Sequence, residues 1–259
     1  MKKWEEFEKK ILDYLKLNYE KSNIKFYAKG GSDSTIPDIK VSIKDKKDFF
    51  LEAKMSNAQS GQFVLLKTDS QFIYSDKNKS ENNQFTDKIL NYINENFETF
   101  KSVKSRGIDI KLPNTLFSDW IINYYKNKNV QFVVTEFNNE LIIFPIEKFN
   151  DYFEVKAVLR RKKSGSSNLP KKDLENIKSF FYDDKIIQEN KSFFLLSEKR
   201  NNKEKFSISN ANYQLSLTTK NKYKIRKLGK TNNPNIIFSV KCIKGQDLKD
   251  LAFFENTLK

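Results

Sequence analysis

The apolar positions near the start of the chain change their period, and this change predicts a helix followed by strands. Over residues 2–20 they recur at helical spacing with charged residues between them: Trp4, Phe7, Ile11, Leu12, Leu15 and Tyr19. Residues 24–28 are typical of a strand that ends at Gly30 and Gly31. From Asp38 to Ile43 polar and apolar residues alternate, and residues 49–54 return after a polar turn, so a hairpin is predicted.

The rest of the chain mixes the two periods, and its last third is mostly strand-like. Helices are predicted over residues 84–100, 114–127, 145–152 and 170–182, and strands over residues 130–135, 141–144, 153–159, 213–218 and 236–242. Asn138 and Asn139 mark a turn between two of these strands. The succession predicts an α/β fold: a mixed central sheet flanked by helices, with strand-rich C-terminal additions. We place a boundary between a catalytic core at residues 1–160 and a basic, strand-rich DNA-recognition region at residues 161–259. The alternative is one continuous domain.

Composition narrows the range of functions. The chain has 259 residues and a formal net charge of +15, which favours a polyanionic partner, nucleic acid first and an anionic membrane second. It contains no histidine, which excludes Ser-His-Asp and Cys-His catalysis and every zinc site that needs an imidazole. The single cysteine, Cys242, can form neither an intrachain disulfide nor a multi-cysteine metal site. Carboxylates, lysines and oxygen-bound cations remain.

Hydropathy and cysteine usage indicate where the protein works. No apolar run approaches the roughly 20 residues that cross a bilayer. The charged start of the chain lacks the apolar stretch of a signal peptide. We therefore expect a cytoplasmic protein without a membrane partner.

The predicted hairpin carries three residues suited to phosphodiester chemistry. Glu52 and Lys54 are two positions apart, so their side chains leave the same face of the strand. Asp38 faces the side of its strand opposite to Ile39. If the two strands of the hairpin pair tightly in antiparallel order, Asp38 comes close to Glu52 and Lys54. Two carboxylates and the Ala53 carbonyl can hold one or two Mg²⁺ ions, with Mn²⁺ as a substitute. The metal would stabilise charge on a phosphate and acidify a bound water, and Lys54 would orient or help deprotonate that water.

Pro37-Asp38 followed by Glu52-Ala53-Lys54 resembles the motif of the PD-(D/E)xK nuclease superfamily, and the match extends over about residues 4–66. The resemblance implies a restriction-endonuclease-like core in which Asp38, Glu52 and Lys54 are catalytic. It also implies a glutamate from the first helix, for which Glu8 fits best and Glu5 second. Within residues 59–63 it allows a polar residue near the metal. Asp33 is interpreted as a turn residue.

A run of basic and small residues follows the predicted strand at residues 153–159. Arg160, Arg161, Lys162, Lys163, Ser164 and Ser166 are residue types that contact DNA phosphates, and Gly165 suggests a mobile loop. The alternative is a solvated surface loop without a ligand. Lysines and asparagines between the C-terminal strands are weaker indications of base contacts.

Together these features predict a type II restriction endonuclease that cuts both strands of double-stranded DNA at a short site, with Mg²⁺ as cofactor. Two cuts in a symmetric site favour a homodimer. The first alternative is a structure-specific nuclease of repair, recombination or mobile-element origin. The second, of another class, is a basic DNA-binding protein without catalysis, in which Asp38 and Glu52 are ordinary surface carboxylates.

Overall fold

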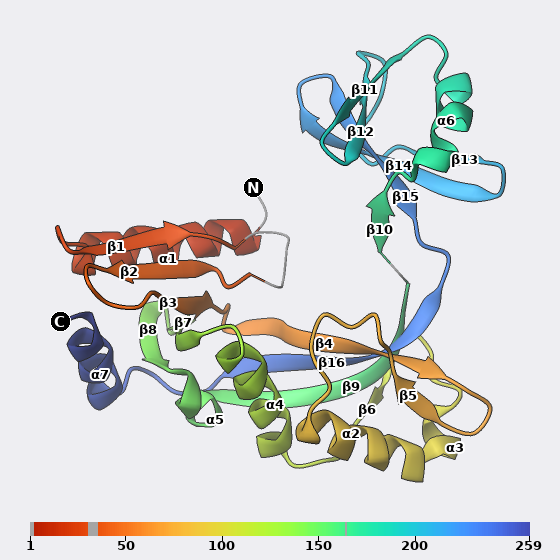
Figure 1. Cartoon of the computed structure of the whole chain (residues 1–259). Helices are drawn as coiled ribbons and strands as arrows, with labels where there is room; N and C mark the ends of the chain where they lie inside the picture. The colour runs from red at the N-terminus through yellow and green to blue at the C-terminus, as the bar shows by residue number, and fades with distance from the viewer. Residues whose placement is uncertain (1–2, 31–35, 164) are drawn as a thin grey trace. The chain divides into compact units, whose positions relative to one another are not determined.

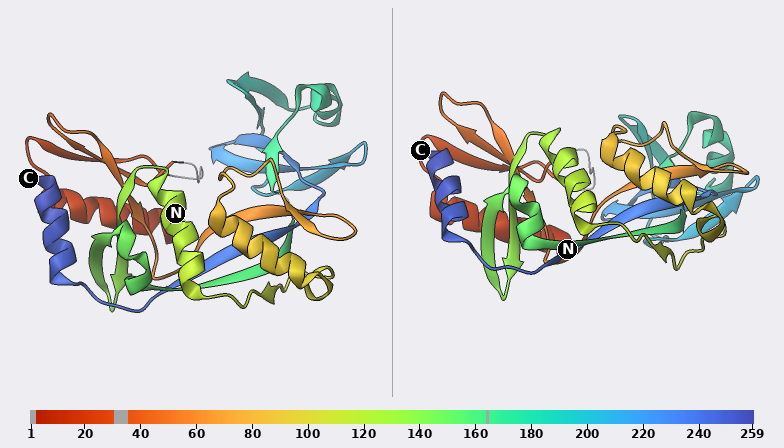
Figure 2. Two further views of the ribbon diagram at one scale, coloured as in Figure 1. Left: turned by 60° about the horizontal axis from the view of Figure 1, so that its bottom comes forward. Right: turned by 90° about the horizontal axis from the view of Figure 1, so that it is seen from below.

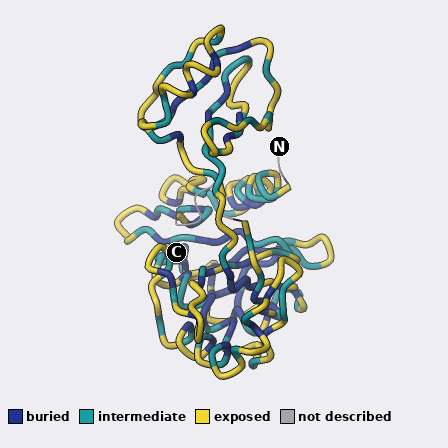
Figure 3. The backbone as a smooth tube through the Cα atoms, turned by 90° about the vertical axis from the view of Figure 1, so that its right-hand side faces the viewer, coloured by how far each residue is buried: buried dark blue, intermediate teal, exposed yellow. Residues whose placement is uncertain are grey.

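A computed structural model describes residues 3–30, 36–163 and 165–259, and the chain forms two compact units. The first unit holds the described residues up to Arg161 together with Pro234–Lys259, and the second is Lys162–Asn233. Each unit has buried stretches of its own, while turns and hairpin ends are exposed (Figure 3). The sequence assigned residues 234–259 to the C-terminal region, whereas in the structure they belong to the first unit.

The first unit begins with a five-stranded mixed sheet (Figure 1). Its order is β1-β2-β3-β7-β8, with β3 and β7 parallel and the other neighbours antiparallel. The strands are β1 (Ile24–Ala28), β2 (Ile39–Ile43), β3 (Phe49–Ala53), β7 (Val130–Phe137) and β8 (Glu140–Pro145). Asn138 and Asn139 join β7 to β8 with positive φ at both positions, as a two-residue hairpin of type I′ requires.

Helices cover both faces of this sheet because β7 is apolar on both. Phe132 and Val134 of β7 share a cluster with Ile11 of α1 (Lys3–Tyr19) and Phe254 of α7 (Leu248–Leu258). Val133 points the other way, into the cluster that holds Ile121 of α4 (Asn114–Lys126). A strand buried on both faces has a continuous apolar run rather than an alternation, and the stretch Phe132-Val133-Val134 fits that description.

A second five-stranded sheet extends the first unit, and α2 lies along one face of it (Figures 1 and 2). Its order is β5-β4-β16-β9-β6. The strands are β4 (Asn57–Lys67), β5 (Phe72–Tyr74), β6 (Ile108–Asp109), β9 (Phe153–Lys163) and β16 (Asn232–Cys242). Phe63, Val155 and Phe238 from its strands pack with Ile89 and Ile93 of α2 in one core.

The helix predicted over residues 84–100 is divided at Asn96 into α2 (Gln84–Glu95) and α3 (Phe97–Phe100). The Asn96 side chain donates to the Tyr92 carbonyl, and its φ and ψ of −109° and 32° leave the helical region. The predicted helix after Pro145 is a 3₁₀ turn, η1 (Ile146–Lys148), followed by α5 (Phe149–Tyr152). None of the helices in the described part of the chain is long and apolar enough to span a bilayer.

The second unit is a six-stranded antiparallel sheet with a short helix. Its main order is β11-β12-β15-β14-β13, and β10 pairs with β15. The elements are β10 (Ser166–Asn168), η2 (Lys171–Asp173), α6 (Leu174–Phe180), β11 (Lys185–Glu189), β12 (Ser192–Leu196), β13 (Lys205–Ile208), β14 (Ala211–Thr219) and β15 (Lys222–Leu228). Ile177 of α6 packs on Leu195, Leu215 and Ile225, so this unit has a separate core.

Candidate active site

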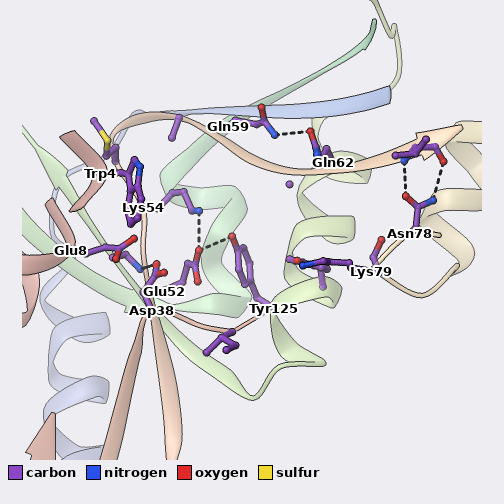
Figure 4. A pocket seen from close by; sticks show the side chains of 18 of the residues that line it. Trp4, Glu8, Asp38, Glu52, Lys54, Gln59, Gln62, Asn78, Lys79 and Tyr125 are labelled. Atoms are coloured by element: carbon purple, nitrogen blue, oxygen red, sulfur yellow. Dashed lines mark hydrogen bonds and ion pairs between the residues drawn. The ribbon is translucent and has the colours of Figure 1, made fainter. Parts of the chain in front are cut away.

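A cleft of about 490 Å³ lies within the first unit, between α1, the end of β3, β4 and α4 (Figure 4). Asp38, Glu52 and Lys54 line it together with Glu8. The structure therefore gathers in one place all four residues that the sequence nominated for catalysis. Ala53, nominated through its carbonyl, also lines the cleft.

Asp38 is placed by the end of the β2–β3 ladder. Ile39 pairs with Leu51, so Asp38 and Glu52 follow directly beyond this pair on neighbouring strands. The Asp38 carbonyl accepts hydrogen bonds from the backbone nitrogens of Lys29 (2.8 Å) and Gly30 (3.0 Å). Its carboxylate Oδ2 accepts a third from the Ala53 nitrogen at 3.0 Å. These contacts fix both the backbone and the side chain of Asp38.

Gly30 approaches Asp38 so closely that no other residue fits without movement. A Cβ atom at Gly30 would lie 2.5 Å from Asp38 Oδ1 and 2.8 Å from Asp38 Cα. The φ of Gly30 lies outside the left-handed region, so the requirement for glycine comes from this contact alone. The glycine that sequence reading assigned to a strand end thus also makes room for the carboxylate.

Glu52 is buried, with only 8% of its surface exposed, and it has two partners in the cleft. Its Oε1 accepts a hydrogen bond from Lys54 Nζ at 2.9 Å and another from the Tyr125 hydroxyl at 2.9 Å. Figure 4 shows both side chains pointing at the same carboxylate oxygen. The backbone nitrogen of Lys54 donates to the Val134 carbonyl, which continues the β3–β7 pairing past Ala53 and fixes the lysine.

Three carboxylates lie close together at one end of the cleft, and burial and neighbouring charge affect the pKa values of two of them. Burial raises the pKa of Asp38 well above its usual value, and the negative charge of Glu52 and then of Glu8 adds to the effect. Burial and the charge of Glu52 likewise raise the pKa of Glu8. Burial alone would lower the pKa of Lys54, but the charge of Glu52 opposes it, and together with Tyr125 and Asp38 raises that pKa well above its ordinary value.

The stretch after the lysine strand also reaches the cleft. Gln59 and Gln62 of β4 line it, and Gln59 Nε2 donates to Gln62 Oε1 at 3.1 Å. Gly61 between them has a φ of 118°, and a Cβ there would lie 2.7 Å from the Trp120 ring. Glycine is therefore needed where β4 passes α4. Among the described residues, no group of three or more acidic or cysteine side chains could by itself hold a metal ion.

The basic run lies elsewhere and is not the loop that its composition suggested. Arg160–Lys163 form the end of strand β9, and they do not line the cleft. Ser166 begins β10, where its Oγ accepts a hydrogen bond from Arg226 Nε at 3.1 Å. The Arg161 nitrogen donates to the Lys104 carbonyl at 3.2 Å, and Ser166 pairs with Leu228 of β15. Ser164 and Asp33 lie outside the described residues.

Several contributors to the cleft were not predicted from sequence, and two of them bear polar groups on its wall. Tyr125 continues the apolar face of α4, which gives no sign that its hydroxyl reaches a carboxylate. The other is the segment Ser75–Ser80, which brings Lys77 and Lys79 to the cleft wall. The Asn78 side chain fixes this segment to β4, because it accepts from the Val64 nitrogen at 2.7 Å and donates to the Val64 carbonyl at 2.9 Å.

Comparison with known proteins gives one informative match. No protein-family model matches the chain, and no curated protein does either. Among solved structures, the chain resembles HhaI endonuclease in complex with DNA, with a TM-score of 0.82 and 35% sequence identity. The alignment covers 99% of this chain and 99% of that one, so the structural similarity extends over both units and the residues that line the cleft.

Proposed function

The chain belongs to the family of the HhaI endonuclease, and from this premise we propose that it is a type II restriction endonuclease that hydrolyses double-stranded DNA with Mg²⁺. The likeness over the whole chain supports an endonuclease acting on DNA. The observation that carries the chemistry is the meeting of Asp38, Glu52 and Lys54 in one cleft. The net charge of +15 suits a polyanionic substrate.

The acidic end of the cleft suits a hard divalent cation. Asp38, Glu52 and the Ala53 carbonyl offer the oxygen ligands that Mg²⁺ prefers. Burial and neighbouring carboxylates disfavour the charged form of Asp38, and a cation would relieve that cost. When bound there, Mg²⁺ would supply positive charge beside the scissile phosphate and increase the acidity of a water molecule. Glu8 would add a carboxylate from α1.

Lys54 serves in this proposal as a fixed positive charge. Its ammonium form is stabilised by Glu52, and its pKa is well above the ordinary value. From this position it can donate to a phosphate oxygen as negative charge develops. Lys54 is thus assigned orientation and charge stabilisation, and help in deprotonating the attacking water is the second role that the sequence proposes for it.

The remaining cleft residues suit the binding of a DNA strand. Lys77 and Lys79 would contact phosphates beside the scissile one, while Gln59 and Gln62 have the amide groups that bond to base edges. Arg160–Lys163 and Ser166 would contact phosphates outside the cleft. A homodimer and a cytoplasmic location stay predictions, and sedimentation of the protein with and without DNA would test the first.

The proposal is tested by incubating plasmid DNA with the protein and Mg²⁺. Discrete fragments are expected, with no cutting in EDTA and little or none with Ca²⁺, which accepts a looser geometry than Mg²⁺. Asp38→Ala and Glu52→Ala should abolish cutting while DNA binding survives, and Lys54→Ala should abolish cutting with cation binding largely intact. Asp13→Ala, which removes an exposed carboxylate from the same helix as Glu8, is the control.

Each other outcome points to an alternative. A smear of fragments would indicate a nuclease without sequence specificity, which recognises DNA structure or cuts at random. DNA that is retarded in the gel but intact would indicate a DNA-binding protein without catalysis. Ordinary cutting by the Asp38→Ala protein would refute the assignment of the site.

A further inference from the structure

The unusual feature of the cleft is that one oxygen of Glu52 takes both hydrogen bonds. Tyr125 and Lys54 each donate to Oε1 at 2.9 Å. Among the described residues no hydrogen bond to Oε2 is found. Tyr125 comes from α4 and Glu52 from β3, so this contact joins the helix to the strand that carries the candidate site.

The position of the Tyr125 hydroxyl is determined by the protein core. Phe117, Ile121 and Tyr125 lie on one stripe of α4, four residues apart, and all three belong to the same buried cluster. Only 4% of Tyr125 is exposed, so its ring has little freedom to rotate away. A hydroxyl on a packed ring is a rigid donor, unlike the flexible ammonium of Lys54.

We propose that Tyr125 is a positioning residue that holds Oε1 of Glu52 and thereby leaves Oε2 as the oxygen that ligates the cation. This inference rests on the proposed function. Without the phenol, Glu52 could rotate about its side-chain bonds and present either oxygen, or both. A partner that fixes the orientation of a ligand raises metal affinity, and its loss typically costs about 10–100-fold.

The phenol is suited to positioning because it is a hydrogen-bond donor. A phenol ordinarily ionises only at about pH 10, so the Tyr125 hydroxyl carries its proton at neutral pH. Lys54 also lies near the ring, with Nζ 5.5 Å from its centroid, so the aromatic face helps to hold the ammonium.

Tyr125→Phe removes the hydroxyl and keeps the ring, and Tyr152→Phe is a matched control. Tyr152 also donates to a buried carboxylate, with 2.6 Å from its hydroxyl to Asp250 Oδ2. It lies in the same unit but does not line the cleft. Both variants lose one phenol–carboxylate hydrogen bond, and Tyr152→Phe also loses the hydrogen bond from the Asp247 nitrogen at 3.3 Å. A general loss of rigidity should therefore affect Tyr152→Phe at least as much as Tyr125→Phe.

The measurements are Mn²⁺ affinity of the DNA-free protein by calorimetry and the Mg²⁺ concentration that gives half-maximal cleavage. We expect Tyr125→Phe to weaken Mn²⁺ binding about 10–100-fold and to raise the half-maximal Mg²⁺ concentration similarly. Its cleavage rate at saturating Mg²⁺ should approach that of the wild type. Tyr152→Phe should match the wild type in all three quantities.

Two results would overturn the inference. One is a folded Tyr125→Phe protein with wild-type Mn²⁺ affinity and wild-type Mg²⁺ requirement. The other is a variant that fails to fold, because the hydroxyl would then serve stability and not the cation. Failure of the proposed function would look different: the wild type itself would not bind Mn²⁺ or cut DNA, or Asp38→Ala would still cut.

Discussion

Gly30→Ala is a small change that should displace the Asp38 carboxylate, which we propose to be catalytic. The new Cβ would lie 2.5 Å from Asp38 Oδ1 and 2.8 Å from Asp38 Cα. Comfortable contacts between heavy atoms begin at about 3.5 Å, so one partner must move by roughly 1 Å. The backbone cannot separate freely, because the Lys29 and Gly30 nitrogens both donate to the Asp38 carbonyl. Rotation of the Asp38 side chain cannot relieve the contact with Cα, so the Asp38 backbone must shift and carry the carboxylate with it.

The size of the effect follows from this displacement. A misplacement of about 1 Å at a reacting centre costs on the order of 10²-fold in rate. That factor corresponds to about 3 kcal/mol of activation free energy. Overpacking also costs about 1–3 kcal/mol of folding free energy, so the variant should still be folded in a protein of ordinary stability.

The assay is the rate of DNA cleavage in a single turnover at saturating protein and Mg²⁺, with thermal unfolding measured in parallel. Gly245→Ala is the control, because a Cβ there has its nearest neighbour at 3.4 Å, on the Phe137 ring, and no left-handed φ. It should cut at the wild-type rate. A folded Gly30→Ala protein that also cuts at the wild-type rate would refute the reasoning, since the carboxylate would then tolerate the clash.

Two further predictions concern the rest of the chain. Replacing Arg160, Arg161, Lys162 and Lys163 together by alanine should weaken binding to specific and random DNA about equally. It should also flatten the dependence of log affinity on log salt by up to roughly 0.9 for each phosphate that the protein no longer neutralises. An unchanged slope would show that these four residues are solvated surface without a DNA contact. In the second unit, hydrogen bonds from Lys227 and then Tyr213 lower the pKa of Asp173 below its usual 3.8. The ionised Asp173 therefore stabilises the fold above pH 3.8, and this stabilisation is lost as the pH falls through the lowered pKa. Asp173→Asn should therefore cost up to about 1 kcal/mol in urea unfolding at pH 7 and nothing in strong acid, and a cost that grows on acidification would contradict this.

The central part of the site could be predicted because it is local in sequence. Asp38, Glu52 and Lys54 lie on one hairpin, and the period of two along each strand determines which side chains share a face. The amphipathic first helix is equally local, which is why Glu8 could be nominated. The structure places all of these residues where the pattern indicated.

The contributions from distant segments could not be predicted, because they depend on tertiary packing. Tyr125 has the same apolar spacing as Phe117 and Ile121, so its pattern indicates only a buried residue. A run of four charged residues followed by small ones is typical of a loop, yet Arg160–Lys163 continue β9. β4 was not recognised as a strand because polar residues such as Gln59 and Gln62 interrupt its alternation to line the cleft.

The second unit joins the first through two adjacent strands, and this has a consequence for how the family can evolve. β9 leads out of the first unit at Arg161 and β16 re-enters it at Pro234, and the two strands are neighbours in one sheet. A short turn between them would complete that sheet without the intervening segment. Lys162–Asn233 has its own core and can therefore be gained, lost or exchanged in a single genetic event. Selection can thus alter this segment without changing any residue that lines the cleft, because those residues all belong to the first unit.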